Sequence, residues 1–233
     1  MNKILKKYRE EVMVGKAYLD TWVPITYKPV ERNRLEKLHY RLLKRSFDLL
    51  SASLLSLLIL PWLIPIMAVI IKLDSKGPVF FIQKRTGRDR KSFYCIKFRS
   101  MRVNDEANRK RVTDKDERIT RVGEFMRKYF VDEIPQLVNV VRGDMSMVGP
   151  RPFMLWDNVR DSKLIENYHD RHKVKPGLTG LAQMRGYHGT VNDQKDLYNR
   201  ITSDLEYIAN WSWYGDIFII FGTIVHIIRG INA

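Results

Sequence analysis

An uncharged, apolar stretch from residue 49 to residue 71 constrains the fold more than any other part of this sequence. As one continuous helix it would be about 34 Å long, enough to cross the roughly 30 Å hydrocarbon core of a bilayer. Pro61 and Pro65 lie near its middle, where each removes a backbone hydrogen bond and kinks or breaks a helix. The stretch therefore forms either a membrane-associated helix or the buried helix of a water-soluble core.

The charges around this stretch do not orient it in a membrane. Basic residues flank it on both sides: Arg41, Lys44 and Arg45 before it, and Lys72 and Lys76 after it. The positive-inside rule then gives no preferred direction. Three alternatives stay open: a re-entrant helix that breaks at Pro61 and returns to the same face, a kinked crossing, and a buried helix. A re-entrant helix needs polar partners for the freed carbonyls, and Ser51, Ser53 and Ser56 are within reach.

The composition restricts the class of protein. A chain of 233 residues forms one large domain or two small ones, and a 45% hydrophobic share excludes a disordered chain. The formal net charge of +15 implies an anionic partner, which is nucleic acid, a membrane surface or a phosphorylated substrate. Cys95 is the single cysteine, which rules out an internal disulfide and fits a reducing compartment. The N-terminus lacks the apolar core of a secretory signal.

Two adjacent carboxylates, Asp132 and Glu133, stand just before Pro135 and an apolar run with helical character. Proline is tolerated in the first turn of a helix, so the pair is expected at a helix start. The free N–H groups of a helix start favour anions, including phosphate. Beside a phosphate and a divalent metal, a carboxylate held there can act as a nucleophile. The alternative is that Asp132 only caps the helix.

Basic residues cluster next to this acidic pair, since most of the excess charge falls between residues 84 and 128. The span 77–101 reads as a β-hairpin, and period two places Lys97 and Arg99 on one face at its end. These cations suit phosphate binding; a solvated edge strand is the alternative. Residues 102–117 are expected to form an exposed loop or lid. Arg127 ends an amphipathic helix expected over 118–130.

Glycine and proline mark two rigid loops further along the chain. Arg151 stands between two prolines, which suits a bidentate grip on a phosphate. The second loop, over residues 173–183, contains Lys175 and ends at Gln183. His169 and His172 lie three residues apart in a polar helix expected over 155–172, where a solvated pair is favoured over a metal site.

Both ends of the chain carry signals of a membrane surface. Residues 1–40 are basic and form either a surface segment near a membrane or a solvated helix with a loop. A polar helix is expected over 195–209. The apolar run over 217–228 is too short to span a bilayer, so it lies in the membrane interface, with Arg229 after it, or packs inside the domain.

Short motifs along roughly residues 41–233 resemble the bacterial sugar transferases, the monotopic phosphoglycosyl transferases that start glycan assembly on a polyprenyl phosphate. The motifs follow the order and spacing of that family: KRSFDL at 44–49, GPVF at 77–80, KFRSM at 97–101, DEIPQL at 132–137, GDMS at 143–146, VGPRP at 148–152 and KPGLTG at 175–180. The resemblance implies an α+β fold that is mostly helical, with a small β-hairpin or sheet, a re-entrant membrane helix and interfacial amphipathic helices. It divides the chain into an N-terminal extension (1–40), the re-entrant helix (41–73) and a catalytic domain (74–233).

The resemblance also implies a chemistry. A UDP-sugar gives its sugar phosphate to Asp132, UMP leaves, and the polyprenyl (undecaprenyl) phosphate then attacks the phosphosugar–enzyme intermediate. Glu133 is expected to be a metal ligand or proton acceptor beside Asp132, with Mg²⁺ or Mn²⁺ as the ion. Phosphate- and substrate-binding roles fall on six residues: Lys97, Arg99, Arg127, Arg151, Lys175 and Gln183. The expected location is the bacterial inner (cytoplasmic) membrane, with the catalytic domain facing the cytoplasm.

The sequence departs from the family pattern in places. Leu60 precedes Pro61 where many members have serine, and the segment 184–187 replaces an Asn-Gly-Arg. That segment resembles the branch that moves hexose 1-phosphates, often glucose or galactose. The larger relatives' N-terminal helical bundle and further domain are missing, so the chain resembles a catalytic-domain-only form, and a homodimer is a further expectation. The competing hypothesis is a non-catalytic peripheral protein that binds anionic lipid; a nucleic-acid binder is disfavoured because the aromatics accompany apolar runs rather than a basic groove.

Overall fold

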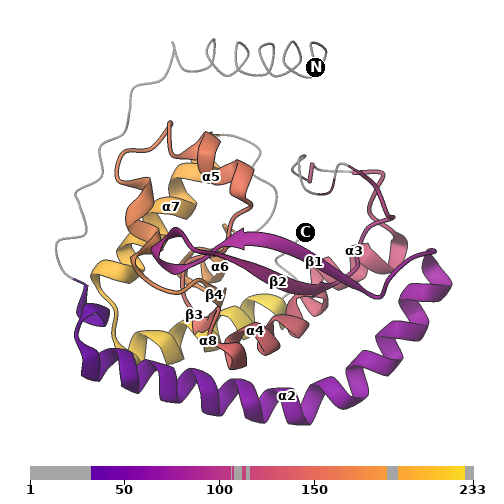
Figure 1. The fold of residues 1–233 in the computed structure, drawn as a ribbon, viewed down its shortest axis with the longest axis horizontal. Coiled ribbons are helices and arrows are strands. Elements are labelled where there is room, and N and C mark those ends of the chain that lie inside the picture. The colour runs from indigo at the N-terminus through magenta and orange to yellow at the C-terminus, as the bar shows by residue number, and fades with distance from the viewer. Residues whose placement is uncertain (1–32, 106, 108–111, 114–115, 188–193, 229–233) are drawn as a thin grey trace.

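The computed structural model describes residues 33–105, 107, 112–113, 116–187 and 194–228. Within them the chain has an α+β fold, mostly helical, with two sheets of two strands each (Figure 1). This confirms the predicted fold class. Most of the predicted N-terminal extension, part of the predicted loop over 102–117, and Arg229 lie outside the described residues.

The predicted membrane helix is α2 (Leu38–Asp74), which bows along one side of the molecule (Figure 1). It includes Pro61 and Pro65 and stays helical through both, so the expected break at Pro61 is wrong. The two prolines are four residues apart and therefore share one helix face. Because the missing hydrogen bonds weaken that face alone, the helix can bend there without ending.

The serines of α2 do not serve the carbonyls that the prolines free. The hydroxyl of Ser51 donates to the carbonyl of Phe47 at 2.7 Å, one turn back on its own helix. The hydroxyl of Ser56 is buried and has no hydrogen-bond partner among the described residues. The expectation that these hydroxyls reach the bend was therefore wrong.

The N-terminal part of α2 is fixed to the domain by buried polar groups. The Nζ atom of Lys44 lies 2.7 Å from Oδ2 of Asp216. One turn later, Oδ1 of Asp48 accepts hydrogen bonds from Ser146 Oγ at 2.9 Å and from the Met147 N–H at 3.0 Å. Buried charges persist only when paired and hydrogen-bonded, so these contacts fix the position of α2 on the domain.

The C-terminal part of α2 packs on the same domain through a second apolar cluster. Its buried members come from α2, the hairpin and α3 (Arg121–Lys128): Met67, Ile71, Phe98 and Met126. Between the two ends the helix is open, and of its most apolar 18-residue stretch only 17% is buried. Leu57 and Trp62 are each 74% exposed. This exposure argues against the core helix of a water-soluble protein.

The predicted hairpin consists of β1 (Phe80–Thr86) and β2 (Ser92–Phe98), which pair antiparallel around η2 (Arg88–Arg90). The structure confirms it. Asn139 joins β2 to α4 (Leu137–Arg142): its Oδ1 accepts from the Ile96 N–H at 3.0 Å, and its Nδ2 donates to the Tyr94 carbonyl at 2.7 Å. The Asn139 side chain therefore holds β2, the strand that carries Lys97, next to α4, the helix that follows Asp132 and Glu133.

A second, parallel sheet of β3 (Ser146–Val148) and β4 (Gly177–Thr179) was not predicted. It brings together the two loops rich in glycine and proline, because Gly149 follows β3 and Gly177 begins β4. A Cβ atom on Gly149 would lie 2.5 Å from the Lys175 carbonyl oxygen, and one on Gly177 would overlap the Gly149 nitrogen. Only glycine allows the two backbones to lie this close.

Helices fill the rest of the domain. They are η1 (Arg34–Glu36), α3 (Arg121–Lys128), α5 (Leu155–Asp161), η4 (Tyr168–Lys173), α6 (Leu181–Met184), α7 (Gln194–Ala209) and α8 (Trp213–Ile228). The helix expected over 155–172 is two separate elements, α5 and η4. His172 is only 6% exposed, so the predicted solvated histidine pair is wrong for this residue.

The C-terminal helix α8 packs against the domain with one face, as one of the two alternatives predicted, and leaves another face exposed. Asp216 and Ile219 are buried against the domain. Tyr214 and Phe218 are 82% and 67% exposed, which leaves an apolar side without a protein partner in the described part of the chain. An exposed apolar row of this kind is typical of an interaction surface.

Candidate active site

The acidic pair lies on η3 (Val131–Gln136), between the hairpin and α4. Asp132 and Glu133 occupy its first turn, and each is 5% exposed. The residue at the N-cap position is Phe130, in a left-handed conformation with φ of 54°, and no side chain caps this helix. Asp132 is therefore not a capping residue, which removes the simplest structural explanation for this carboxylate.

Glu133 is held by two cations from different elements. Lys97, on β2, places Nζ 2.6 Å from Oε1. Arg151, in the turn after β3, approaches with both terminal nitrogens, at 2.6 Å from Oε1 and 3.1 Å from Oε2. Burial alone would raise the pKa of Glu133, but Arg151 and Lys97 outweigh it and hold the pKa well below its usual range. Glu133 therefore stays ionised.

Asp132 has the opposite environment one residue away. Among the described residues its carboxylate has neither a hydrogen bond nor an ion pair within 4.0 Å. Burial raises its pKa to about 6, Lys97 opposes this rise, and the neighbouring charge of Glu133 adds to it. Adjacent carboxylates whose pKa values are pushed apart are the usual mark of two different chemical roles. Glu133 is the member held by cations, and Asp132 is the member whose carboxylate has no such partner among the described residues.

Arg127 is the third cation beside the pair. It lies on α3, where its Nε donates to Ser100 Oγ at 3.0 Å. Its charge lowers the pKa of Asp132, as do those of Lys97 and Arg151. The structure therefore brings together five of the residues that the sequence singled out: Lys97, Arg127, Asp132, Glu133 and Arg151.

Three other predicted residues have different contacts. The Arg99 guanidinium donates to the carbonyls of Ser75 at 2.7 Å and Lys76 at 2.5 Å, so it binds the C-terminal end of α2. Strand β2 ends at Phe98, so the expected alternation does not carry Arg99 to the face of Lys97. Burial and the charge of Arg45 lower the pKa of Lys175. Gln183 donates to the Leu178 carbonyl at 3.0 Å, while its buried Oε1 has no partner in the described residues.

The sequence interpretation missed Arg85 and Asn139. Arg85 Nη1 donates to the Pro152 carbonyl at 3.1 Å, directly after Arg151. Its signal was weak, since one more arginine in a basic hairpin is unremarkable. Asn139 offered a clearer signal, because a lone amide inside an apolar helical run needs buried hydrogen-bond partners.

The donor set is compatible with a magnesium ion that binds together with a substrate. Among the described residues no group of three or more His, Cys, Asp or Glu side chains could hold a metal ion. Mg²⁺ often binds one or two carboxylates and completes its shell with phosphate oxygens and water. Asp132 offers an unengaged carboxylate for this, whereas both oxygens of Glu133 already face cations.

A comparison with known families decides the classification. The family model described as bacterial sugar transferase matches residues 39–230. The chain belongs to the bacterial sugar transferase family. The family match starts in the second residue of α2 and extends past α8, so the exposed apolar helix is part of the family region rather than an addition to it.

Several curated members of the family are similar to this chain. A protein of Escherichia coli (strain K12), named UDP-glucose:undecaprenyl-phosphate glucose-1-phosphate transferase, is 47% identical over 186 residues, which are 79% of this chain and 40% of that protein. The exopolysaccharide production protein PSS of Rhizobium leguminosarum bv. phaseoli is 46% identical over 188 residues, 78% of this chain and 94% of that protein. The UDP-N-acetylgalactosamine-undecaprenyl-phosphate N-acetylgalactosaminephosphotransferase of Aeromonas hydrophila is 41% identical over 198 residues, 83% of this chain and 45% of that protein. The match thus spans less than half of two of these relatives and most of the third.

Proposed function

We propose that this chain transfers a sugar 1-phosphate from a UDP-sugar to undecaprenyl phosphate at the membrane surface, through a covalent intermediate on Asp132. The products are undecaprenyl-diphosphate-sugar and UMP, and the reaction is the first membrane step of glycan assembly. One observation carries the proposal: Glu133 is fixed by Lys97 and Arg151, while the carboxylate of Asp132 beside it has no hydrogen-bond or ion-pair partner among the described residues. The names of the related transferases support the same reaction class.

The first step forms one phosphorus–oxygen bond and breaks another. A carboxylate oxygen of Asp132 attacks the phosphorus that carries the sugar, and the bond to UMP breaks, so that UMP leaves with the electron pair. The charges of Lys97, Arg127 and Arg151 act on Asp132, and the same cations would stabilise the negative charge of the diphosphate. Bound Mg²⁺, held by Asp132 and the donor's phosphate oxygens, would add to this charge neutralisation.

The second step restores the enzyme. An oxygen of undecaprenyl phosphate attacks the same phosphorus, and the bond to Asp132 breaks, which returns the carboxylate. The same cations serve both steps, because both acceptors attack one phosphorus at one place. Glu133 keeps Lys97 and Arg151 in position between the steps, since it stays ionised throughout.

We propose that α2 is a re-entrant membrane helix. Both of its ends pack against one domain: Lys44 pairs with Asp216, and Ile71 packs with Phe98. The middle, around Leu57 and Trp62, is apolar and exposed. A helix that crossed a bilayer would separate its ends by about 30 Å of hydrocarbon, with the domain on one side only. Entry and return to the same side fits these contacts, and places Asp132 where a lipid phosphate can reach it.

The donor and the compartment follow from the same reasoning. UDP-glucose is the donor we propose first, since the more similar named relative uses glucose and a less similar one uses N-acetylgalactosamine. Nucleotide sugars are made in the cytoplasm, so we place the domain on the cytoplasmic face of the inner membrane. The homodimer remains a prediction.

The test is UMP release by the purified chain in detergent or lipid nanodiscs, with undecaprenyl phosphate, Mg²⁺ and a panel of UDP-sugars. We expect release with UDP-glucose from the wild type and none above background from Asp132→Asn, with both proteins equally associated with membranes. Turnover by Asp132→Asn at the wild-type rate would show that Asp132 is not the nucleophile. If the wild type binds membranes but releases UMP from none of the UDP-sugars, the hypothesis of a non-catalytic lipid-binding protein replaces that of a transferase.

A further inference from the structure

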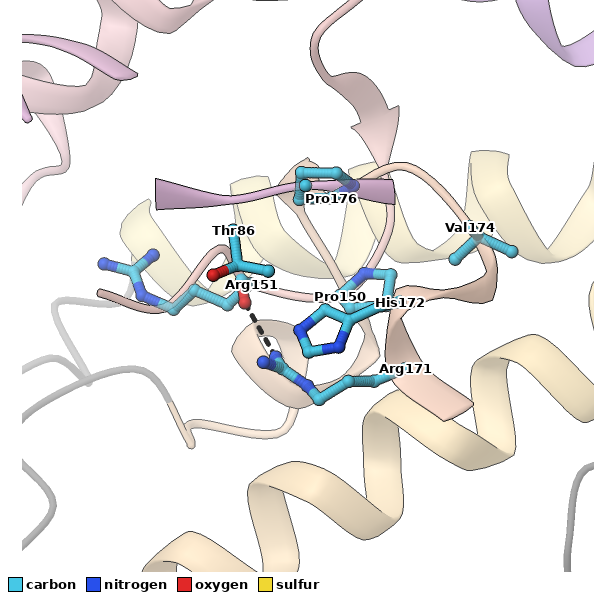
Figure 2. A pocket seen from close by; sticks show the side chains of 8 residues that line it. Thr86, Pro150, Arg151, Arg171, His172, Val174 and Pro176 are labelled. Atoms are coloured by element: carbon cyan, nitrogen blue, oxygen red, sulfur yellow. Dashed lines mark hydrogen bonds between the residues drawn. The ribbon is translucent and has the colours of Figure 1, made fainter. Parts of the chain in front are cut away.

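Arg151 is gripped through its main chain by a second arginine. Arg171, on η4, donates from Nη2 to the Arg151 carbonyl at 2.7 Å. The same nitrogen lies 2.6 Å from Oδ2 of Asp204, on α7, and Nε lies 3.2 Å from it. Both side chains of this ion pair are 1% exposed. Figure 2 shows the bond from Arg171 to the Arg151 oxygen, while the Arg151 side chain runs the other way, away from His172.

The next carbonyl along the loop accepts a hydrogen bond from another arginine. Arg85, on β1, donates to the Pro152 carbonyl at 3.1 Å. Two arginines from different elements therefore hold successive carbonyls of the loop. The prolines on either side of Arg151 restrict the backbone further, because their rings fix φ. With its backbone constrained in this way, Arg151 can direct its guanidinium to one place, which is Glu133.

The surroundings of the Arg171 side chain and of the loop that carries Arg151 leave little room for movement. The Arg171 guanidinium stacks on the Phe153 ring, 4.0 Å from its centroid. The cavity between the loop and η4, lined in part by Pro150 and His172 (Figure 2), has a volume of only about 10 Å³, roughly one water molecule. Burial, together with the charge of Arg171, lowers the pKa of His172 to about 3, so this ring adds no competing charge.

A buried ion pair is weak support for stability, because well-packed apolar residues often do as well. What an apolar pair cannot supply is a directed donor to one carbonyl oxygen. A displacement of about 1 Å at a catalytic group can cost about a hundredfold in rate. The hydrogen bond from Arg171 to the Arg151 carbonyl is therefore better explained by the accurate placement of Arg151 at the active site than by a gain in stability.

We propose that Arg171 and Asp204 are positioning residues, which set the place of Arg151 and through it the grip on Glu133 and on the donor phosphate. The proposal rests on the proposed function, because its readout is the transfer of sugar phosphate. Neither residue touches the reacting atoms.

The experiment compares Arg171→Lys and Asp204→Asn with the wild type, each also combined with Arg151→Lys. We expect each single variant to lower kcat/KM for UMP release by about 10-fold to 100-fold. In the Arg151→Lys background the same changes should cost less than about twofold, because the residue that they position is already displaced. Arg160→Lys is the control: it alters an ion pair with Asp161 within α5, in which the arginine side chain is 55% exposed, and should stay within about twofold of the wild type.

Thermal unfolding of every variant is measured in parallel, and Asp204→Asn replaces Arg171→Lys if the latter does not fold. Single variants with the wild-type kcat/KM would overturn the inference. It would also be overturned if each change lowered kcat/KM by the same factor in the Arg151→Lys background as in the wild type, because that result would indicate a general structural effect. A wild type that releases no UMP from any UDP-sugar contradicts the proposed function and the inference together. An active wild type with unaffected variants contradicts the inference alone.

Discussion

Lys44 and Asp216 form a buried ion pair, with Nζ 2.7 Å from Oδ2, that ties the apolar helix α2 to the last helix, α8. Tyr207 and Trp211 also donate to the Asp216 carboxylate, at 2.9 and 3.2 Å. The pair connects residues that are far apart in the sequence, at the place where the apolar helix begins. It therefore couples the membrane element to the domain that carries Asp132.

We expect Lys44→Met to destabilise the protein by about 3 kcal/mol, because it leaves the Asp216 charge buried without its cation. Chemical unfolding in detergent measures the change. Lys37→Met, at an exposed position just before α2, is the control and should change stability by less than about 0.5 kcal/mol. Equal effects of the two substitutions would show that the ion pair does not hold α2.

Removing the charge of Asp132 and removing that of Glu133 should change the stability of the protein in opposite directions. The pKa of Asp132 is raised to about 6 by burial, so its charge at pH 7 costs folding free energy. Asp132→Asn should therefore stabilise the protein at pH 7, by on the order of 1–3 kcal/mol, and the gain should vanish as the pH falls to about 4, where Asp132 is protonated in the folded wild type. Chemical unfolding at several pH values measures it.

Glu133→Gln is the matched comparison, because it leaves Lys97 and Arg151 without their shared anion. It should destabilise the protein by about 3 kcal/mol at pH 7. Two substitutions with effects of the same sign would contradict the division of roles between the carboxylates.

The rate of the first step should depend on the ionisation of Asp132. The reactive form is the carboxylate and its pKa is about 6, so kcat/KM should rise with pH through about 6 and level off above 7. Glu133 stays ionised over this range and adds no second limb. The pH profile of UMP release measures this, and a rate that is flat from pH 5 to pH 8 would argue against Asp132 as the nucleophile.

Labelling can test the topology of α2. Cys95 is buried, so a Cys95→Ser background allows single cysteines to be placed at Glu36 and Lys76, on either side of the helix. Both should react with a membrane-impermeant maleimide from the same side of sealed vesicles. Trp62→Cys, in the exposed apolar middle, should be protected until detergent is added. Reaction of the two ends from opposite sides would establish a crossing helix.

Periodic patterns predicted the larger elements, because they come from single faces of helices and strands. The hairpin and α3 were predicted in this way, whereas α2 was predicted from an uninterrupted, uncharged apolar run. Strands β3 and β4 have three residues each, too few for a period, and they pair across 31 positions from Ser146 to Gly177. Their pairing depends on the close approach of two glycine loops, which a linear pattern does not contain.

The candidate site was predicted in outline, and its details depend on three-dimensional contacts. The positions of Asp132, Glu133, Lys97 and Arg151 followed from motifs, and the structure places them together. Arg99 lies at the end of α2 because the strand ends one residue earlier than alternation required. The role of Arg171 had no local signal, since its partners come from a loop and a helix distant in sequence.

The central claim is that Asp132 becomes covalently bound to a sugar phosphate. The most direct measurement is the intact mass of the acid-quenched protein after incubation with UDP-glucose and Mg²⁺ in the absence of undecaprenyl phosphate. We expect the wild type to gain the mass of a hexose phosphate, which is lost on addition of undecaprenyl phosphate, and Asp132→Asn to stay unmodified. An unmodified wild type, under conditions where complete turnover is fast, would contradict the account.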